Sequence, residues 1–270
     1  MNTIETLDIQ VKKSSLIAIV TGLEHSGTTY LSRLITCHPL IDSGFECGVL
    51  LADSPKDFVN VQPFYDWMQV EVEKGHWGIE KKDIAQICLA ENWEDMYRKI
   101  IQYSPVFRDK SSYILDKTPG YMPKLDQILE KVLVPCLVIK KDIFFQYLSF
   151  KKRDVSLKQF VSRYVSYMSG LSRALEKFND RIYIIEYKEL YFNTAKKIID
   201  VFDFINLDFR ENCSETEFSS NEQNLNLFRK NIKIDPFPRN FKYNKEVEKV
   251  KELTEKEINT LKSLEEKNHF

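Results

Sequence analysis

The chain of 270 residues carries 39 Lys and Arg residues against 40 Asp and Glu residues, so its net charge is −1. Such a balance argues against a protein that coats nucleic acid, and any basic site must be local. A hydrophobic content of 43% is enough for a core, and no run reaches the ~18 apolar residues that a membrane span needs. The 5 cysteines are scattered without a C-x-x-C pair. This pattern predicts buried, reduced thiols in a cytoplasmic protein.

The first predicted element is a buried strand that leads through a glycine loop into a helix. Residues 16–20 read LIAIV, a β-branched run typical of a parallel strand covered on both faces. Gly22 and Gly27 then have the spacing of the phosphate-binding sequence G-x-x-x-x-G-K-[ST], but Thr28 stands where its lysine belongs. A helix is predicted over residues 28–37, where a His-Pro pair ends it.

Strands and helices alternate through the rest of the chain. Further strands are predicted at residues 112–116, 135–139 and 181–186, with helices at 124–132 and 194–204. The alternation predicts a three-layer α/β/α fold with a central, mostly parallel sheet, in a single domain over residues 1–270.

Three other segments complete the predicted organisation. Residues 64–104 carry all three tryptophans and are predicted to form a helical insertion that covers the carboxyl edge of the sheet, where ligands usually bind. A capping box formed by Thr254 and Glu257 predicts a C-terminal helix at about 254–267. The polar stretch 211–223 is expected to be a mobile loop, within a segment 211–239 whose order could depend on a bound cofactor.

The loop at residues 26–29 offers donors to one phosphate group. Backbone N–H groups of Ser26, Gly27, Thr28 and Thr29 lie at a helix N-terminus, which carries about half a positive charge. Three hydroxyl groups add side-chain donors at the same place. Without the lysine, the loop suits one phosphate with a short anionic extension better than the outer phosphates of a magnesium nucleotide. The alternative is a tight turn that uses glycine for geometry alone.

The sequence SGTTYLSRL, at residues 26–34, resembles the 5′-phosphosulfate loop of sulfotransferases. These enzymes use 3′-phosphoadenosine 5′-phosphosulfate (PAPS), and their loop typically reads [KR]-[ST]-G-T-[TS]. Members also carry an arginine followed eight positions later by a serine, which bind the 3′-phosphate after a later strand. Here Lys141 stands eight residues before Ser149. Lysine offers a point charge in place of the arginine fork.

Two further segments extend the resemblance to sulfotransferases, here of the bacterial type. Tyr187 in IIEYKEL resembles a tyrosine that lies near the nucleotide, and Arg229 and Lys230 resemble more loosely the basic loop that closes over the 3′-phosphate. His25 departs from the pattern, since members have Lys or Arg there. With a reference pKa near 6.5, His25 is expected to act as a pH-dependent cation or as a general acid on the leaving phosphate.

The resemblance also implies catalytic candidates. Lys117 in ILDKTPGY is similar to a lysine of a K-[TD]-P segment that contacts the transferring sulfuryl group in members that sulfate tyrosines or sugars. Glu46, seven residues after Pro39, matches the catalytic glutamate of tyrosine-sulfating members. Glu24 and His38 are competing candidates for the general base.

Together these resemblances predict transfer of a sulfuryl group from PAPS to a hydroxyl acceptor, with PAP as the product and no metal cofactor. A carbohydrate is the favoured acceptor, with a tyrosyl or small-molecule hydroxyl as alternatives. Its pocket is expected in the 58–93 region, where aromatic side chains could stack on a sugar ring: Phe58, Phe64, Tyr65 and Trp67. Two other functions stay open. A P-loop kinase would need a magnesium site, for which Asp116 is the available aspartate, and a catalytically silent protein would only bind PAP.

Overall fold

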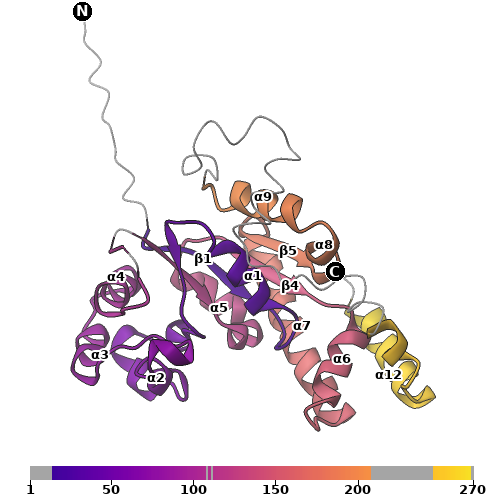
Figure 1. The fold of residues 1–270 in the computed structure, drawn as a ribbon. Coiled ribbons are helices and arrows are strands. Elements are labelled where there is room, and N and C mark those ends of the chain that lie inside the picture. Colours follow the sequence, from indigo (N-terminus) through magenta and orange to yellow (C-terminus); the bar gives the residue numbers. More distant parts are fainter. Residues whose placement is uncertain (1–13, 108, 111, 208–245, 269–270) are drawn as a thin grey trace, which may run out of the picture.

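The computed structural model describes residues 14–107, 109–110, 112–207 and 246–268 (Figure 1). In this part of the chain, five parallel strands form one sheet in the order β2-β3-β1-β4-β5. The strands are β1 Leu16–Thr21, β2 Ile41–Asp42, β3 Tyr113–Lys117, β4 Cys136–Lys140 and β5 Ile182–Glu186. The four predicted strands are confirmed to within one residue at each end. The two residues of β2 are too few to give a strand pattern in the sequence.

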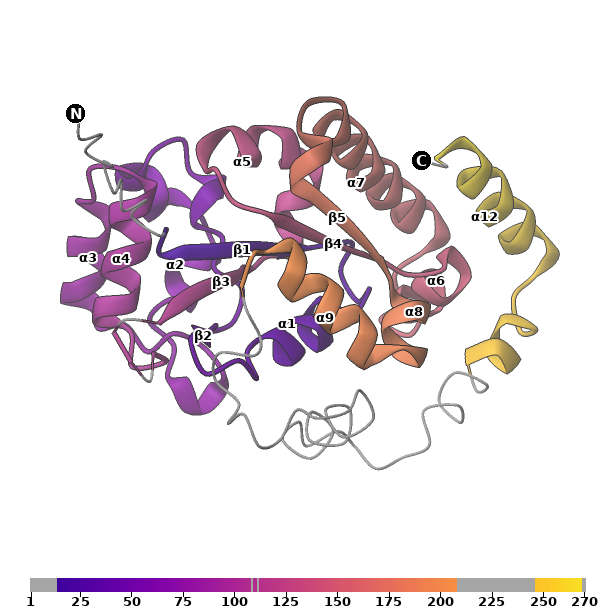
Figure 2. The ribbon, with the colours of Figure 1, turned by 90° about the horizontal axis from the view of Figure 1, so that it is seen from above.

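Helices cover both faces of the sheet, so the predicted three-layer fold is confirmed (Figure 2). One face is covered by α1 Thr28–Ile35, α8 Tyr187–Phe192 and α9 Thr194–Phe204, and the other by α5 Leu125–Lys131 and α7 Leu157–Phe178. Because successive side chains on a strand point to opposite faces, β1 contributes side chains to the hydrophobic clusters on both faces of the sheet. Ile19 packs in the cluster that contains α5 and α7, whereas Val20 packs in the cluster that contains α1 and α9.

The register of the central strands gathers their carboxyl ends at one edge. Val20 of β1 pairs with Lys117 of β3, and Thr21 pairs with Val138 of β4. The segments that follow these three strands therefore leave the sheet side by side. This edge is where ligands bind in open parallel sheets.

The helical insertion lies to one side of the sheet, where α4 packs against β3 (Figure 2). It contains α2 Phe64–Trp67, α3 Lys81–Cys88 and α4 Trp93–Tyr103, with 3₁₀ turns η1 Val49–Leu51, η2 Pro55–Asn60 and η3 Val72–Lys74 nearby. The expectation that it covers the carboxyl edge is wrong for α4. Glu94 at the start of α4 accepts hydrogen bonds from the backbone and hydroxyl of Ser15, at the amino end of β1.

Two helices that the sequence analysis did not predict follow β4 in the chain. They are α6 Ile143–Lys151 and α7, which begins with a capping box formed by Ser156 and Gln159. The C-terminal helix α12 Glu255–Lys267 begins at the Thr254 capping box and packs against α6. Glu257 accepts hydrogen bonds there from the Tyr147 hydroxyl (2.7 Å) and the Lys151 ammonium (2.8 Å). Two 3₁₀ turns complete the described elements: η4 Pro119–Lys124 and η5 Asn179–Arg181.

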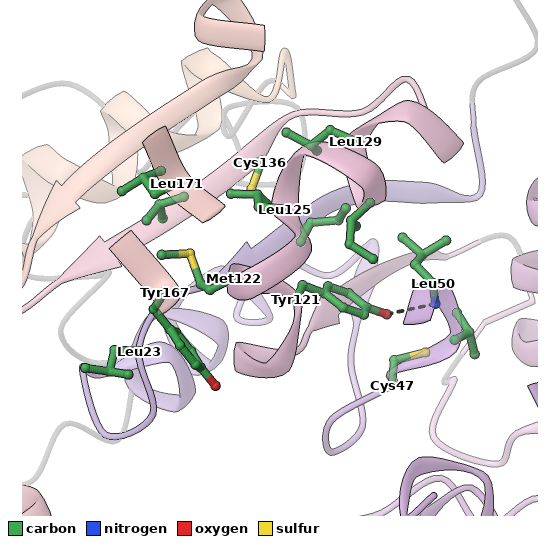
Figure 3. Packing of buried hydrophobic residues seen from close by; sticks show 14 of the residues in the cluster. Leu23, Cys47, Leu50, Tyr121, Met122, Leu125, Leu129, Cys136, Tyr167 and Leu171 are labelled. Atoms are coloured by element: carbon green, nitrogen blue, oxygen red, sulfur yellow. Dashed lines mark hydrogen bonds between the residues drawn. The ribbon is translucent and has the colours of Figure 1, made fainter. Parts of the chain in front are cut away.

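Apolar side chains fill the space between the sheet, η4, α5 and α7 (Figure 3). Cys47 and Cys136 are buried in this cluster, and burial raises the pKa of the Cys136 thiol to about 12, which makes it unreactive. Cys37 is exposed, so the prediction of buried thiols does not hold there. Among the described helices, none is long and apolar enough to cross a membrane.

Candidate active site

The glycine loop is pressed between β4 and the ring of Tyr187. At Gly22, a Cβ atom would stand 2.5 Å from the carbonyl oxygen of Ile139 on β4. Gly27 has a φ of 111°, and a Cβ atom there would stand 2.7 Å from a ring carbon of Tyr187. Both positions therefore require glycine. The structure places the Tyr187 ring directly against the loop. The resemblance implied that this tyrosine lies near the nucleotide, which stays a prediction.

The loop presents donors from α1 and turns one predicted donor inward. The N–H groups in the first turn of α1 have no intrahelical acceptor, as in any helix, and Thr28 and Thr29 line a pocket. The Ser26 N–H instead donates to the Leu23 carbonyl oxygen at 3.0 Å. The Ser26 hydroxyl is buried, and within the described residues it has no hydrogen-bond partner. Ser26 thus offers only its hydroxyl, and only if the loop adjusts around a ligand.

The pocket has a volume of about 620 Å³ and lies at the carboxyl edge of the sheet. The glycine loop, the segment after β2, and the helices α6 and α7 contribute to its wall. Its lining residues are Glu24, His25, Gly27, Thr28, Thr29, Phe45, Glu46, Pro119, Ser149, Lys152, Arg153 and Arg163. Half of this lining is made of residues that the sequence analysis had assigned to cofactor binding or catalysis.

Lys117 and Glu46, predicted from separate segments, lie next to each other. Glu46 lines the pocket, and the Lys117 side chain beside it is only 4% exposed. The Lys117 Nζ lies 3.5 Å from the Glu46 Oε1 and 4.6 Å from the centroid of the Phe45 ring. Burial lowers the pKa of Lys117 and raises the pKa of Glu46, while the charge of each partner opposes both shifts. The pair therefore combines a half-buried carboxylate of increased basicity with a cation beside it.

The segment that carries Glu46 is held by hydrogen bonds to residues that directly follow β3. The Thr118 Oγ1 accepts hydrogen bonds from the backbone N–H groups of Cys47 (3.1 Å) and Gly48 (3.0 Å). Nearby, the Tyr121 hydroxyl accepts from the Leu50 N–H at 3.2 Å (Figure 3). These bonds join residues about 70 positions apart in the chain, and the sequence analysis gave Thr118 and Tyr121 no role.

Asp116 anchors this arrangement from inside the core. It is fully buried, and its carboxylate accepts hydrogen bonds from the hydroxyls of Tyr97 (2.6 Å), Thr118 (2.8 Å) and Tyr121 (2.7 Å). Both oxygens are thus engaged by the protein. Burial raises the pKa of Asp116, and these hydroxyl donors oppose that shift. The aspartate that a magnesium site would require is therefore used as a structural anchor.

His25, in the glycine loop, also lines the pocket. It is exposed and has a positive φ of 67°, and its ring centroid lies 5.3 Å from that of Phe150. Partial desolvation lowers the pKa of His25, the positive charge of Arg153 lowers it further, and the Glu24 carboxylate opposes them. His25 is therefore mostly neutral near pH 7 in the ligand-free protein.

The two competing base candidates have different surroundings. Glu24 lines the pocket, and its Oε1 accepts from the Tyr167 hydroxyl at 2.8 Å and lies 3.6 Å from the Arg163 guanidinium. His38 is buried on the α1–α9 side of the sheet, where its Nδ1 accepts from the Leu40 N–H at 3.2 Å and its ring packs against Phe202. Its place in that core makes His38 a structural residue, and the alternative of a catalytic His38 is wrong.

The predicted 3′-phosphate residues also come together. Lys141 follows β4, and the Lys141 Nζ lies 3.3 Å from the Ser149 Oγ two turns along α6. The same Nζ lies 5.2 Å from the centroid of the Tyr187 ring and 3.3 Å from the Oε1 of Glu246. The two remaining predicted residues, Arg229 and Lys230, lie outside the described residues.

Three pocket cations were missed by the sequence analysis: Lys152, Arg153 and Arg163. The run KKR at residues 151–153, directly after the predicted phosphate-binding serine, is a signal that could have revealed two of them. Arg163 has no such signal, because its place depends on the unpredicted helix α7. Among the described residues, no group of three or more His, Cys, Asp or Glu side chains is placed to hold a metal ion.

The expected aromatic acceptor surface needs correction. Phe58 is fully buried and packs against Tyr65, so it cannot stack on a sugar. Phe45 is the aromatic residue that lines the pocket, and the Trp67 ring packs edge-on against it with 5.2 Å between centroids. Trp77 is fully buried.

Comparison with known proteins identifies similar folds and the family of the chain. The chain resembles the sulfotransferase domain from the Synechococcus PCC 7002 olefin synthase, with 16% identity, a TM-score of 0.56, and coverage of 75% of this chain and 77% of that chain. It also resembles the sulfotransferase domain from the curacin biosynthetic pathway, with 15% identity, a TM-score of 0.50, and coverage of 73% and 75%. At these identities the likeness shows the fold alone. No curated protein sequence matches the chain. The model of the sulfotransferase family matches residues 18–211, well over half of the sequence, and the chain belongs to this family.

Proposed function

We propose that this sulfotransferase takes its sulfuryl group from PAPS and transfers it to a hydroxyl group of a carbohydrate. The observation that carries the proposal is the Lys117–Glu46 pair, whose Nζ and Oε1 lie 3.5 Å apart at a pocket that the glycine loop also lines. A base for an acceptor hydroxyl and a cation for a transferring anionic group thus meet beside a phosphate-binding loop.

The residues present fit the donor. The first turn of α1, with Thr28 and Thr29, would hold the 5′-phosphosulfate, and Lys141 with Ser149 would hold the 3′-phosphate. Lys141 already binds an anionic group, the Glu246 carboxylate at 3.3 Å, which supports an anion site there. Tyr187 lies between these two sites, against Gly27 on one side and 5.2 Å from the Lys141 Nζ on the other. When bound, PAPS supplies a sulfuryl group attached to a phosphate leaving group.

The side chains at the pocket take different roles in the transfer reaction. Glu46 accepts the proton of the acceptor hydroxyl as that oxygen bonds to sulfur, and its raised pKa makes it a stronger base. Lys117 stabilises negative charge on the sulfuryl oxygens, with Phe45 and Glu46 fixing its position. The α1 donors stabilise charge on the departing phosphate, and His25 adds to this when it is protonated.

A carbohydrate acceptor is supported by the half-buried aromatic ring of Phe45 beside the Glu46 carboxylate. A sugar can place one apolar face on such a ring while its hydroxyl groups reach a carboxylate. The alternative of a P-loop kinase is not supported, because Thr28 replaces the phosphate-binding lysine and Asp116 is engaged by three hydroxyl groups.

The test combines cofactor binding with turnover. Calorimetric titration of PAP into the metal-free protein is expected to show micromolar binding, and transfer from labelled PAPS to a panel of mono- and oligosaccharides should yield a sulfated product. Glu46→Gln should lower kcat about 10²- to 10⁴-fold and leave PAP affinity unchanged. Glu71→Gln is the matched control, because Glu71 is an exposed carboxylate paired with Lys74 outside the pocket.

Three results would contradict the proposal. Absence of PAP binding would remove the donor, and transfer only to tyrosyl peptides or phenols would remove the carbohydrate. Full turnover by the Glu46→Gln variant would remove Glu46 from the role of base while leaving the donor in place.

A further inference from the structure

We propose that Glu246 competes with the 3′-phosphate of the nucleotide for Lys141, so that this carboxylate must leave before a 3′-phosphorylated ligand binds. The inference rests on the proposed PAPS function and adds a control on its cofactor site that comes from the C-terminal part of the chain. Glu246 would lower the affinity for PAP and leave the affinity for nucleotides without a 3′-phosphate unchanged.

Glu246 is the counter-ion of a nearly buried cation. The Lys141 side chain is 6% exposed, and the Glu246 side chain is 28% exposed. Their Nζ and Oε1 atoms lie 3.3 Å apart, and the Nζ lies equally far from the Ser149 Oγ. A nearly buried ammonium group needs a negative partner, and a bound phosphate would provide one.

A 3′-phosphate and the Glu246 carboxylate would use the same donors. Ser149 donates its own hydroxyl hydrogen to the Phe145 carbonyl oxygen at 2.9 Å, so Lys141 supplies the strongest donors at this point. A phosphate that reached the Lys141 Nζ would lie beside the Glu246 carboxylate, and two anions at such a distance repel each other. Displacement of Glu246 removes that repulsion and frees one Lys141 donor.

Within the described residues, Glu246 and the helix that follows it are tied to the fold by separate polar contacts. It belongs to a helical turn at 246–250, whereas α12 is fixed to α6 through Glu257, which accepts from Tyr147 and Lys151. Displacement of the Glu246 carboxylate would thus leave the Glu257 contacts of α12 in place. Its contact with Lys141 is the ion pair that such a movement would break.

The experiment measures the affinity of PAP and of 5′-AMP, which lacks the 3′-phosphate, for five proteins: wild type, Glu246→Gln, Glu248→Gln, Lys141→Met and the Lys141→Met/Glu246→Gln double variant. Glu246→Gln should tighten PAP binding about three- to tenfold and leave 5′-AMP binding unchanged. Glu248→Gln is the matched control, because the exposed Glu248 pairs with Lys251. In the Lys141→Met background the gain from Glu246→Gln should disappear.

The outcomes separate this inference from the proposed function. If wild type binds PAP and Glu246→Gln leaves that affinity unchanged or weakens it, competition at Lys141 is overturned and the donor assignment stands. Equal tightening of PAP and 5′-AMP, or a gain that persists without Lys141, also overturns it, because the effect would then not involve the 3′-phosphate. If neither nucleotide binds any of the five proteins, the donor assignment and the inference fail together.

Discussion

At the scale of single residues, His25 makes the glycine loop dependent on pH. Desolvation and Arg153 lower its pKa below 6.5 in the ligand-free protein. A dianionic phosphate at the loop would favour the imidazolium and raise that pKa. Proton uptake and ligand binding are then coupled, so PAP affinity should increase as the pH falls toward and below 6.5. The same shift has the opposite sign for the stability of the ligand-free fold, which should decrease as the pH falls through 6.5 because the unfolded chain binds this proton more readily.

His25→Lys should therefore remove most of the pH dependence. At pH 8, where His25 is neutral, the lysine variant should bind PAP on the order of tenfold tighter, and the difference should shrink at pH 6 because the wild-type imidazole is then partly charged. His25→Asn is the neutral control, because asparagine also tolerates the positive φ of 67° at this position. Calorimetric titrations at pH 6, 7 and 8 measure all three proteins.

Equal pH profiles for the wild type and the asparagine variant would contradict this role of His25. The phosphates of PAP also titrate near pH 6, and that contribution is common to the three proteins. The difference between the profiles therefore isolates the imidazole.

Single residues also show which parts of the candidate site can be predicted from the sequence. Glu46 and Lys117 were assigned from two separate segments that resemble sulfotransferase motifs, and in the structure their Oε1 and Nζ atoms lie 3.5 Å apart. Thr118 was missed because its role lies in two hydrogen bonds to Cys47 and Gly48, which exist only after the chain has folded. A local sequence pattern can indicate the chemistry of a side chain. Its hydrogen-bond partners, which lie far away in the sequence, become known only from the fold.

At the scale of elements, the end of β3 positions the candidate base. Asp116 is fixed by hydroxyl donors in the core, Thr118 donates to Asp116, and the Thr118 oxygen accepts from the segment after Glu46. The end of β3 thus connects the buried Asp116 to the segment that carries Glu46.

Replacement of Thr118 by valine should separate positioning from folding. Valine has nearly the same shape but leaves the Cys47 and Gly48 N–H groups without their acceptor, which should cost about 1–3 kcal/mol of unfolding free energy. If the variant folds, we expect kcat to fall at least tenfold with little change in PAP affinity, because Glu46 loses its fixed position while the glycine loop does not. Thr118→Ser keeps the oxygen and should restore most of kcat.

Two measurements check this prediction. Denaturant unfolding gives the change in stability, and steady-state kinetics with PAPS gives kcat and KM for both variants. A valine variant with normal kcat, or a serine variant as impaired as valine, would show that the Thr118 oxygen does not position Glu46.

Elements differ in how well the sequence predicts them. The four longer strands are apolar runs, which parallel strands require, and all four were found. The helix α7 was missed although its capping box and its buried residues at helical spacing, among them Phe160, Tyr164, Tyr167 and Leu171, are visible in the sequence. The insertion was predicted as helical, but its position was wrong for α4, because only packing decides which edge of the sheet a helical hairpin covers.

At the scale of the whole molecule, a nearly neutral chain carries a local positive field. The net charge is −1, yet the pocket is lined by three cations, Lys152, Arg153 and Arg163, against two carboxylates, Glu24 and Glu46. Most of these side chains are exposed, so their interaction with a phosphate ligand is screened by salt over a distance of about 10 Å at 0.1 M. Their contribution belongs to the field of the pocket rather than to a single contact.

PAP affinity should therefore weaken with ionic strength, about three- to tenfold between 0.05 and 0.5 M salt. Arg153→Gln should lower the affinity at low salt and flatten this dependence. Lys82→Gln changes the net charge by the same amount, but Lys82 lies on α3 and pairs with Glu80 at the surface. If the local field governs binding, the lysine variant should follow the wild-type salt curve. If both variants shift the curve equally, the total charge of the molecule attracts the ligand and the pocket cations have no special part in it.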